Sequence, residues 1–133
     1  MKQTLIFITT LFFCQLAFSQ PSNNNCANAT EICISKTKSG TTNNATSEVC
    51  GTCADGSMVV GSACFQLVKT VWYQFTTNAT GGNADINVSG LNCSAGSNGL
   101  GGIVYAAGTP CNSSTYVPVS NCVVNSGGNF TLN

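Results

Sequence analysis

The number of cysteines constrains this chain more than any other feature. Eight of its nine cysteines follow the first 19 residues: Cys26, Cys33, Cys50, Cys53, Cys64, Cys93, Cys111 and Cys122. An even number of cysteines in a small exported chain is typical of a disulfide framework, which stabilises a fold with a small apolar core. All eight are therefore candidates for disulfide bonds, but sequence spacing does not choose among the possible pairings.

Residues 1–19 have the pattern of a secretory signal peptide. Lys2 precedes a mostly apolar run at 5–13, and the segment closes on the small-x-small cleavage pattern Ala-Phe-Ser at 17–19. The apolar run is shorter than the roughly 20 residues that a membrane-spanning helix needs. We therefore expect cleavage and export, with no membrane insertion afterwards. The remaining residues, 20–133, suit a single domain.

The charge of the chain excludes two classes of partner. After residue 19 there are three lysines, four acidic residues, no arginine and no histidine, which leaves one net negative charge. A nucleic-acid-binding protein needs a basic patch, and a protein that binds acidic membranes needs a cluster of lysine and arginine. The sequence therefore predicts neither nucleic acid nor an acidic membrane as a partner.

Short apolar runs separated by Gly- and Asn-rich turns are typical of β-strands, and no window shows helical spacing. Alternation predicts that Ile86 and Val88 point inward, and Pro118 predicts an edge or irregular strand. The candidate strands are 31–35, 65–78, 84–91, 101–108, 115–123 and 129–133.

These strands predict an all-β fold, an antiparallel β-sandwich or jelly-roll over residues 20–133 that is stapled by disulfides. A sandwich usually has about seven strands, and the sequence offers five or six. The module is therefore either complete with fewer strands or truncated at its C-terminus, and the sequence leaves both open.

The most apolar of these runs, 65–78, contains the motif Trp72-Tyr73-x-Phe75. Strand alternation places Tyr73 and Phe75 on one face and Trp72 on the other. A single tryptophan in the most apolar strand is typical of a core residue. We interpret Trp72, Tyr73 and Phe75 as the core motif of the fold.

The stretch SEVCGTCADGS holds the one C-x-x-C motif, Cys50 and Cys53. A redox cysteine usually sits at a helix N-terminus, where the dipole lowers its pKa. Here a turn follows Cys53, and the nearby charges, Glu48 and Asp55, are acidic. A zinc ribbon needs a second such motif. We interpret both cysteines as structural, each bridging to a different partner, and keep a thiol oxidoreductase as the less favoured alternative.

The sequence predicts no enzyme, no cofactor and no metal site. Without histidine, Ser-His-Asp and Cys-His arrangements are impossible. The four acidic residues lie in no glycosidase motif. Asp55 in its turn, or Asp85 with Asn83 and Asn87, offer oxygens for calcium, but an ordinary solvated strand face gives the same pattern.

Four aromatic residues carry a different alternative, a carbohydrate-binding module. Trp72, Tyr73, Tyr105 and Tyr116 could form a platform on which sugar rings stack. This alternative requires Trp72 or Tyr105 to be exposed beside a shallow groove, whereas the interpretation as core requires them to be buried.

Several segments together resemble a module of secreted and surface proteins of Bacteroidetes. They cover most of residues 23–133: NNNCANAT, VWYQFTT, ADINVSGLNC, GIVYAAGTPCNSSTYVPVSNCV and NFTLN. The most specific element is Trp72-Tyr73-x-Phe75, followed by the cysteine pair Cys111 and Cys122. Such β-sandwich modules are appended to secreted peptidases and adhesins, and are often exported through the type IX system.

The resemblance implies a non-catalytic module of a larger extracellular protein, secreted or at the cell surface, that serves adhesion or surface architecture. Its expected partner is an extracellular ligand or surface polymer such as a glycan. A bridge between Cys111 and Cys122 would close a short loop and stabilise the fold by roughly 3 kcal/mol. The chain departs from the family in stopping before a further strand, in lacking a C-terminal sorting domain, and in its additional cysteines Cys50, Cys53 and Cys64.

Overall fold

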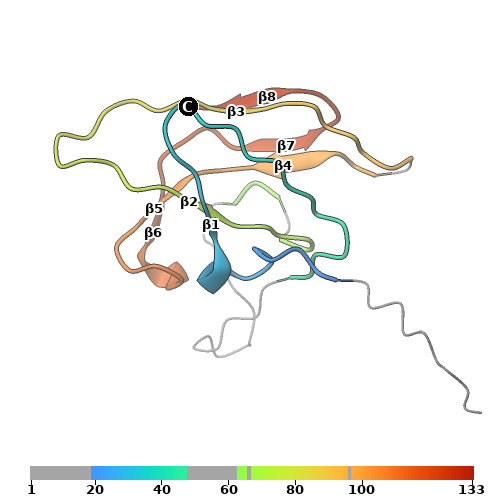
Figure 1. Ribbon diagram of the computed structural model, residues 1–133, viewed down its shortest axis with the longest axis horizontal. Helices are drawn as coiled ribbons and strands as arrows, with labels where there is room; N and C mark the ends of the chain where they lie inside the picture. The colour runs from blue at the N-terminus through green and yellow to red at the C-terminus, as the bar shows by residue number, and fades with distance from the viewer. Residues whose placement is uncertain (1–18, 48–62, 66, 96) are drawn as a thin grey trace, which may run out of the picture.

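A computed structural model describes residues 19–47, 63–65, 67–95 and 97–133 of the chain (Figure 1). The strands are β1 (Thr30–Glu31), β2 (Tyr73–Gln74), β3 (Ile86–Val88), β4 (Leu100–Gly102), β5 (Tyr105–Ala107), β6 (Tyr116–Pro118), β7 (Val123–Ser126) and β8 (Phe130–Leu132). Two 3-10 turns, η1 (Cys26–Asn28) and η2 (Ser113–Thr115), are the helical elements of this part of the chain. The predicted signal peptide lies outside the described residues except for Ser19, and Cys50 and Cys53 lie outside them as well.

The strands pair into two-stranded ladders. β3 with β8, β4 with β7 and β5 with β6 are antiparallel, whereas β1 with β2 is parallel. The predicted all-β, antiparallel and disulfide-stapled class is confirmed. The sandwich itself stays a prediction, because the described strands form four separate pairs and not two wide sheets.

Two of these ladders are the two halves of one long hairpin. β4 runs on into β5, and β6 returns through residues 119–122 into β7, so the predicted strand 101–108 is interrupted. At the interruption the Val119 N–H donates to the Val104 carbonyl at 3.0 Å, and the Val104 N–H donates to the Ser120 hydroxyl at 2.9 Å. The serine side chain thus replaces a ladder bond where the returning strand bulges. Pro118 lies directly before this irregular stretch, as the sequence predicts.

Two consecutive glycines allow β4 to be packed closely on both faces. Successive strand residues face opposite sides, and a Cβ on Gly101 would lie 2.9 Å from Phe65. A Cβ on Gly102 would lie 3.1 Å from Phe130 and 3.2 Å from Leu132, both on β8. Phe65 therefore covers one face of β4 and β8 covers the other, and Figure 1 shows the β3–β8 pair lying over the β4–β7 pair.

β8 and the residue after it are also held to the bulge of the hairpin by one residue, Asn121. The Asn121 N–H donates to the Asn133 carbonyl at 3.1 Å, and the Asn133 N–H donates to Asn121 Oδ1 at 2.9 Å. Asn121 Nδ2 donates to the Thr131 carbonyl at 3.0 Å. The backbone and side-chain amides of Asn121 thus make hydrogen bonds with Thr131 and Asn133 of the kind that a neighbouring strand would make.

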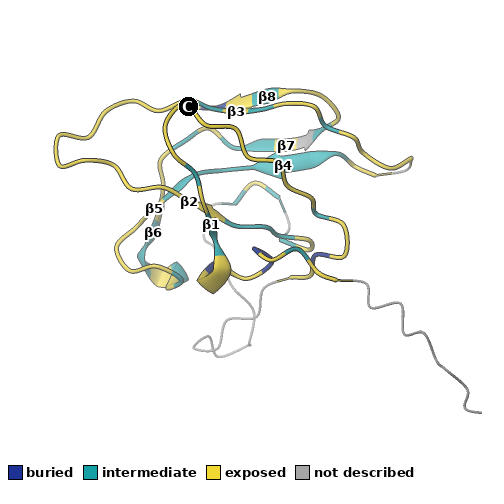
Figure 2. Cartoon of the chain, in the orientation of Figure 1, coloured by how far each residue is buried: buried dark blue, intermediate teal, exposed yellow. Residues whose placement is uncertain are grey.

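Few side chains are buried, as the mostly yellow and teal chain in Figure 2 shows. Among the described residues, the buried hydrophobic ones are Cys26, Ala45 and Leu132, and the buried polar ones are Asn23 and Asn24. Alternation in β3 is as predicted, with partly buried side chains on either side of an exposed asparagine. Because the described residues bury so few side chains, cross-links and side-chain amides hold much of the shape of this part of the chain.

The predicted core motif is only partly right. Trp72 is partly buried and packs against Cys26. Tyr73 and Phe75 are 38% and 37% exposed, so their assignment to the core is wrong. Alternation separated Trp72 from the other two correctly, but β2 is only two residues long, and its Tyr73 faces an open depression instead of a second layer.

Candidate functional site

Two disulfides tie distant parts of the chain together, Cys26–Cys111 and Cys64–Cys122. The bridge expected between Cys111 and Cys122 is therefore wrong. Between these two cysteines lie η2 and β6, and the two cysteines pair with different, earlier segments of the chain.

Cys33 and Cys93, two of the eight candidates, are exposed and form no disulfide. Cys33 lies in a turn that its own carbonyl closes by accepting from the Lys36 N–H at 3.2 Å. Cys93 lies in the exposed loop after β3. The roles of Cys50 and Cys53 stay predictions because neither residue is described.

Three of the four candidate platform residues pack around the Cys26–Cys111 bridge. The rings of Trp72 and Tyr116 meet edge to face with centroids 6.2 Å apart, and those of Tyr105 and Tyr116 stack at 5.7 Å. The Cys111 N–H donates to the Tyr116 hydroxyl at 3.0 Å, and this hydroxyl also lies 3.2 Å from the Cys26 Sγ. We call Cys26, Cys111, Trp72, Tyr105 and Tyr116 the aromatic cluster. Its tryptophan and tyrosines are partly buried and pack against Cys26, as the interpretation of Trp72 as a core residue expects.

Two polar atoms of the aromatic cluster are buried without a hydrogen-bond partner in the described part of the chain, Trp72 Nε1 and Tyr105 Oη. Burial raises the pKa of Tyr105 above its ordinary value, because the phenolate would lose solvation. Tyr116 differs from Tyr105 in that its hydroxyl is bonded to the loop that carries Cys111.

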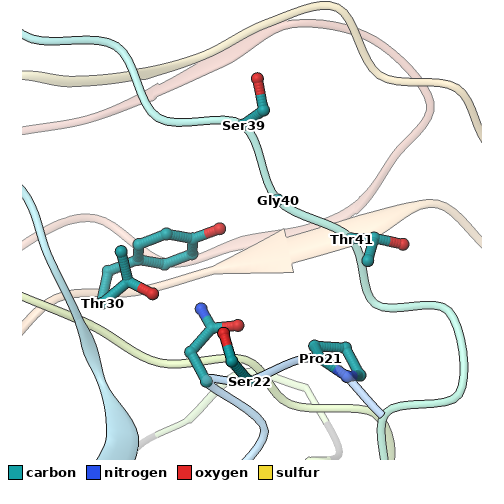
Figure 3. A pocket seen from close by; sticks show the side chains of 8 residues that line it. Pro21, Ser22, Thr30, Ser39, Gly40 and Thr41 are labelled. Atoms are coloured by element: carbon teal, nitrogen blue, oxygen red, sulfur yellow. The ribbon is translucent and has the colours of Figure 1, made fainter. Parts of the chain in front are cut away.

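The fourth platform residue, Tyr73, lines an open depression of about 360 Å3 (Figure 3). Its lining comes from the segment before η1, from β1, from the loop at 39–41 and from β2. The lining residues are Pro21, Ser22, Asn23, Thr30, Ser39, Gly40, Thr41 and Tyr73. None of them carries a charge, and apart from the tyrosine four of them carry hydroxyl groups.

Two buried asparagines, Asn23 and Asn24, hold the segment before η1 in place beside this depression. Asn23 pairs with Trp72 twice, since the Trp72 N–H donates to the Asn23 carbonyl at 2.9 Å and Asn23 Nδ2 donates to the Trp72 carbonyl at 2.9 Å. Asn24 joins the same segment to the loop that contains Thr46. The Thr46 N–H donates to Asn24 Oδ1 at 2.7 Å, and Asn24 Nδ2 donates to Thr46 Oγ1 at 3.0 Å. The sequence analysis gave these two asparagines no role.

Gly40 allows the loop at 39–41 to cross the depression beside Tyr73. A Cβ at Gly40 would collide with the Tyr73 hydroxyl oxygen and would lie 3.2 Å from Tyr73 Cζ. Only glycine permits so close an approach of backbone and ring. The depression is therefore shaped by a specific glycine contact and not only by a gap between loops.

The structure gives no support to the calcium ligands that the sequence offers. Asn87 Oδ1 accepts from the Thr131 hydroxyl at 2.7 Å across the β3–β8 ladder, and Asp55 is not described. Within the described ranges, no three residues among His, Cys, Asp and Glu come together as a metal site. In the same ranges, no helix has the length and apolar character needed to cross a membrane.

Comparisons of the chain with protein-family models, with curated proteins and with solved structures give no match. A functional assignment must therefore rest on the residues and their geometry.

Proposed function

We propose that the chain is a non-catalytic extracellular module that serves adhesion or surface architecture within a larger protein, akin to the Bacteroidetes modules that its sequence resembles. The observation that carries this proposal is the pair of disulfides, which join residues 85 and 58 positions apart. Bridges of this kind persist in oxidising compartments and are rare in the cytosol. A stapled fold with a small core suits a surface that must survive outside the cell.

The polar groups of the described chain favour binding over catalysis. Its two described carboxylates, Glu31 and Asp85, are both exposed and so lack the burial that tunes a catalytic acid. Its buried polar side chains, Asn23 and Asn24, bond to backbone and to Thr46, which is a structural use of the amide.

A second candidate, carbohydrate binding, is favoured by one observation that is independent of the disulfides. Tyr73 is exposed in an uncharged depression rich in hydroxyl groups. The platform considered from sequence, with Trp72, Tyr105 and Tyr116, does not support this candidate, because these residues pack in the aromatic cluster. The ligand of an adhesive module would then be a glycan.

Adhesion is tested with beads that carry the secreted chain. Their retention is measured on insoluble polysaccharides and on protein-coated surfaces, with beads carrying the chain after reduction and alkylation as the control. We expect retention on at least one surface, and loss of retention after reduction, because the bridges hold the surface in shape. Oxidised beads that are retained on none of these surfaces would contradict the proposal.

A further inference from the structure

We propose that the depression around Tyr73 binds one unit of a neutral carbohydrate, with Asn23 and Thr30 supplying polar contacts and the Tyr73 ring a stacking face. The inference rests on the adhesive function proposed above and names its site and ligand class. Its test is chosen so that the two proposals can fail separately.

Asn23 is the first reason to place a ligand here. The residue is only 6% exposed and lines the depression. Its Nδ2 is engaged by the Trp72 carbonyl, which fixes the orientation of the amide. Its Oδ1 accepts no hydrogen bond from any described residue, and this oxygen is not among the buried atoms that lack partners. A nearly buried residue thus presents an open acceptor to the depression, where a ligand hydroxyl could donate.

Hydroxyl groups around this acceptor complete a polar rim. Ser22 and Thr30 make no side-chain hydrogen bond within the described chain, and Figure 3 shows the Thr30 hydroxyl turned toward the opening. Thr41 Oγ1 accepts from the Asn43 N–H at 3.0 Å. The hydroxyl groups of Thr41 and Ser39 both point away from the other lining side chains in Figure 3, so these two residues are left out of the site. Such mixed donors and acceptors match the hydroxyl groups of a sugar.

Tyr73 supplies the apolar part of the site. Its ring is 38% exposed, and the contact with Gly40 limits where the ring can lie. An aromatic face that is open on one side accepts the C–H face of a sugar ring, while the polar rim holds its hydroxyls. The volume of about 360 Å3 lies near the lower end of the range for small-molecule sites, as one sugar unit requires.

The lining selects against charged ligands. It contains no lysine or arginine and no carboxylate. An acidic sugar or a phosphate ester needs a cationic partner to offset its desolvation. A neutral hexose or pentose needs no cationic partner and therefore suits this uncharged lining.

The test is calorimetric titration of the secreted chain with neutral cello-, xylo-, manno- and galacto-oligosaccharides, with oligogalacturonate as the acidic comparison. We expect at least one neutral series to bind and oligogalacturonate not to bind. Tyr73→Ala should weaken binding about tenfold through loss of the stacking face, whereas Tyr73→Phe should retain it. The matched control is Phe75→Ala, an aromatic of nearly equal exposure that does not line the depression. It should leave the affinity unchanged.

Far-UV circular dichroism and Trp72 fluorescence establish that each variant folds. Gly40→Ala is a second variant, which should weaken binding because its Cβ displaces the Tyr73 ring. Binding that survives both Tyr73→Ala and Gly40→Ala would overturn this site. Failure of every neutral oligosaccharide to bind, or preference for oligogalacturonate, would overturn the ligand class. In either case retention of the beads on some surface leaves adhesion standing, whereas beads retained nowhere refute adhesion itself.

Discussion

The two halves of the long hairpin are each tied to an earlier segment of the chain, but by different physical means. In the half made of β5 and β6, which we call the tip, the loop between the strands is joined to η1 by Cys26–Cys111, inside the aromatic cluster. In the half made of β4 and β7, which we call the base, Cys122 directly before β7 is joined to Cys64, and the neighbouring Phe65 packs on Gly101. Cys26 is buried, whereas Cys64 is exposed. The tip therefore combines a cross-link with buried packing, and the base combines a cross-link with close contact at glycines.

The largest difference between tip and base is expected from removal of each bridge. In the chain-entropy model, loops of 85 and 58 residues give bridges of nearly equal value, roughly 4–5 kcal/mol each. Replacing both Cys26 and Cys111 by alanine should cost more than replacing both Cys64 and Cys122, because the tip also loses packing around a buried sulfur. Urea unfolding followed by the fluorescence of Trp72, the single tryptophan, measures both. A larger loss at the base would contradict this comparison.

The glycines at the base should resist substitution. Gly101→Ala should cost about 1–3 kcal/mol, because its Cβ would lie 2.9 Å from Phe65 and 3.0 Å from the Val123 carbonyl. Gly102→Ala should cost less, since it meets only side-chain atoms that can shift. The matched control is Gly127→Ala, which has open space around it and should change stability by no more than about 0.5 kcal/mol. Equal urea midpoints for the Gly101 and Gly127 variants would refute close packing on β4.

Two tyrosines of the tip should respond oppositely to loss of the hydroxyl. Tyr116→Phe leaves the Cys111 N–H without its acceptor, which should cost about 1–3 kcal/mol. Tyr105→Phe removes a buried hydroxyl that has no partner in the described chain, so stability should stay equal or rise by up to about 1 kcal/mol. Thermal unfolding of the two variants side by side measures the contrast. A greater loss in the Tyr105 variant would show that this hydroxyl has a stabilising partner.

The smallest expected effect is a dependence of stability on alkaline pH at the tip. Burial raises the pKa of Tyr105, so the folded chain holds the phenol proton more tightly than the unfolded chain does. This contribution is fully present below the ordinary tyrosine pKa of 10.0 and is lost as the pH rises through the raised pKa. Urea midpoints of the wild type should therefore fall further than those of Tyr105→Phe in this range. Parallel pH profiles would contradict burial of the hydroxyl.

Local alternation predicts which residues share a face, but not which face is covered. Ile86 and Val88 are partly buried as expected, because they share a face with their ladder partners Leu132 and Phe130, which pack on Gly102. In β2 the same rule separated Trp72 from Tyr73 correctly, yet only the tryptophan found a covering layer. That layer comes from Cys26 and from the distant hairpin tip, and local spacing contains no information about either.

The disulfide pairs and the depression depend on contacts that are still more distant in sequence. Cys111 pairs with Cys26, 85 positions away, although Cys122 is much nearer along the chain. Asn23 acquires its role only when it lies beside Trp72, and the three consecutive asparagines before Cys26 were the one available signal. The β class was predictable because short apolar runs and turns are local properties, whereas the site requires the assembled topology.

The most direct test of the account is a map of the disulfides in the chain produced under oxidising conditions. Free thiols are alkylated first, and the chain is then digested with pepsin at acidic pH, where thiol–disulfide exchange is slow because thiolates are protonated. Mass spectrometry of the linked peptides should find Cys26 joined to Cys111 and Cys64 joined to Cys122, with alkylated Cys33 and Cys93. A peptide in which Cys111 is joined to Cys122 would contradict the account, because neither half of the hairpin would then be tied to an earlier segment of the chain.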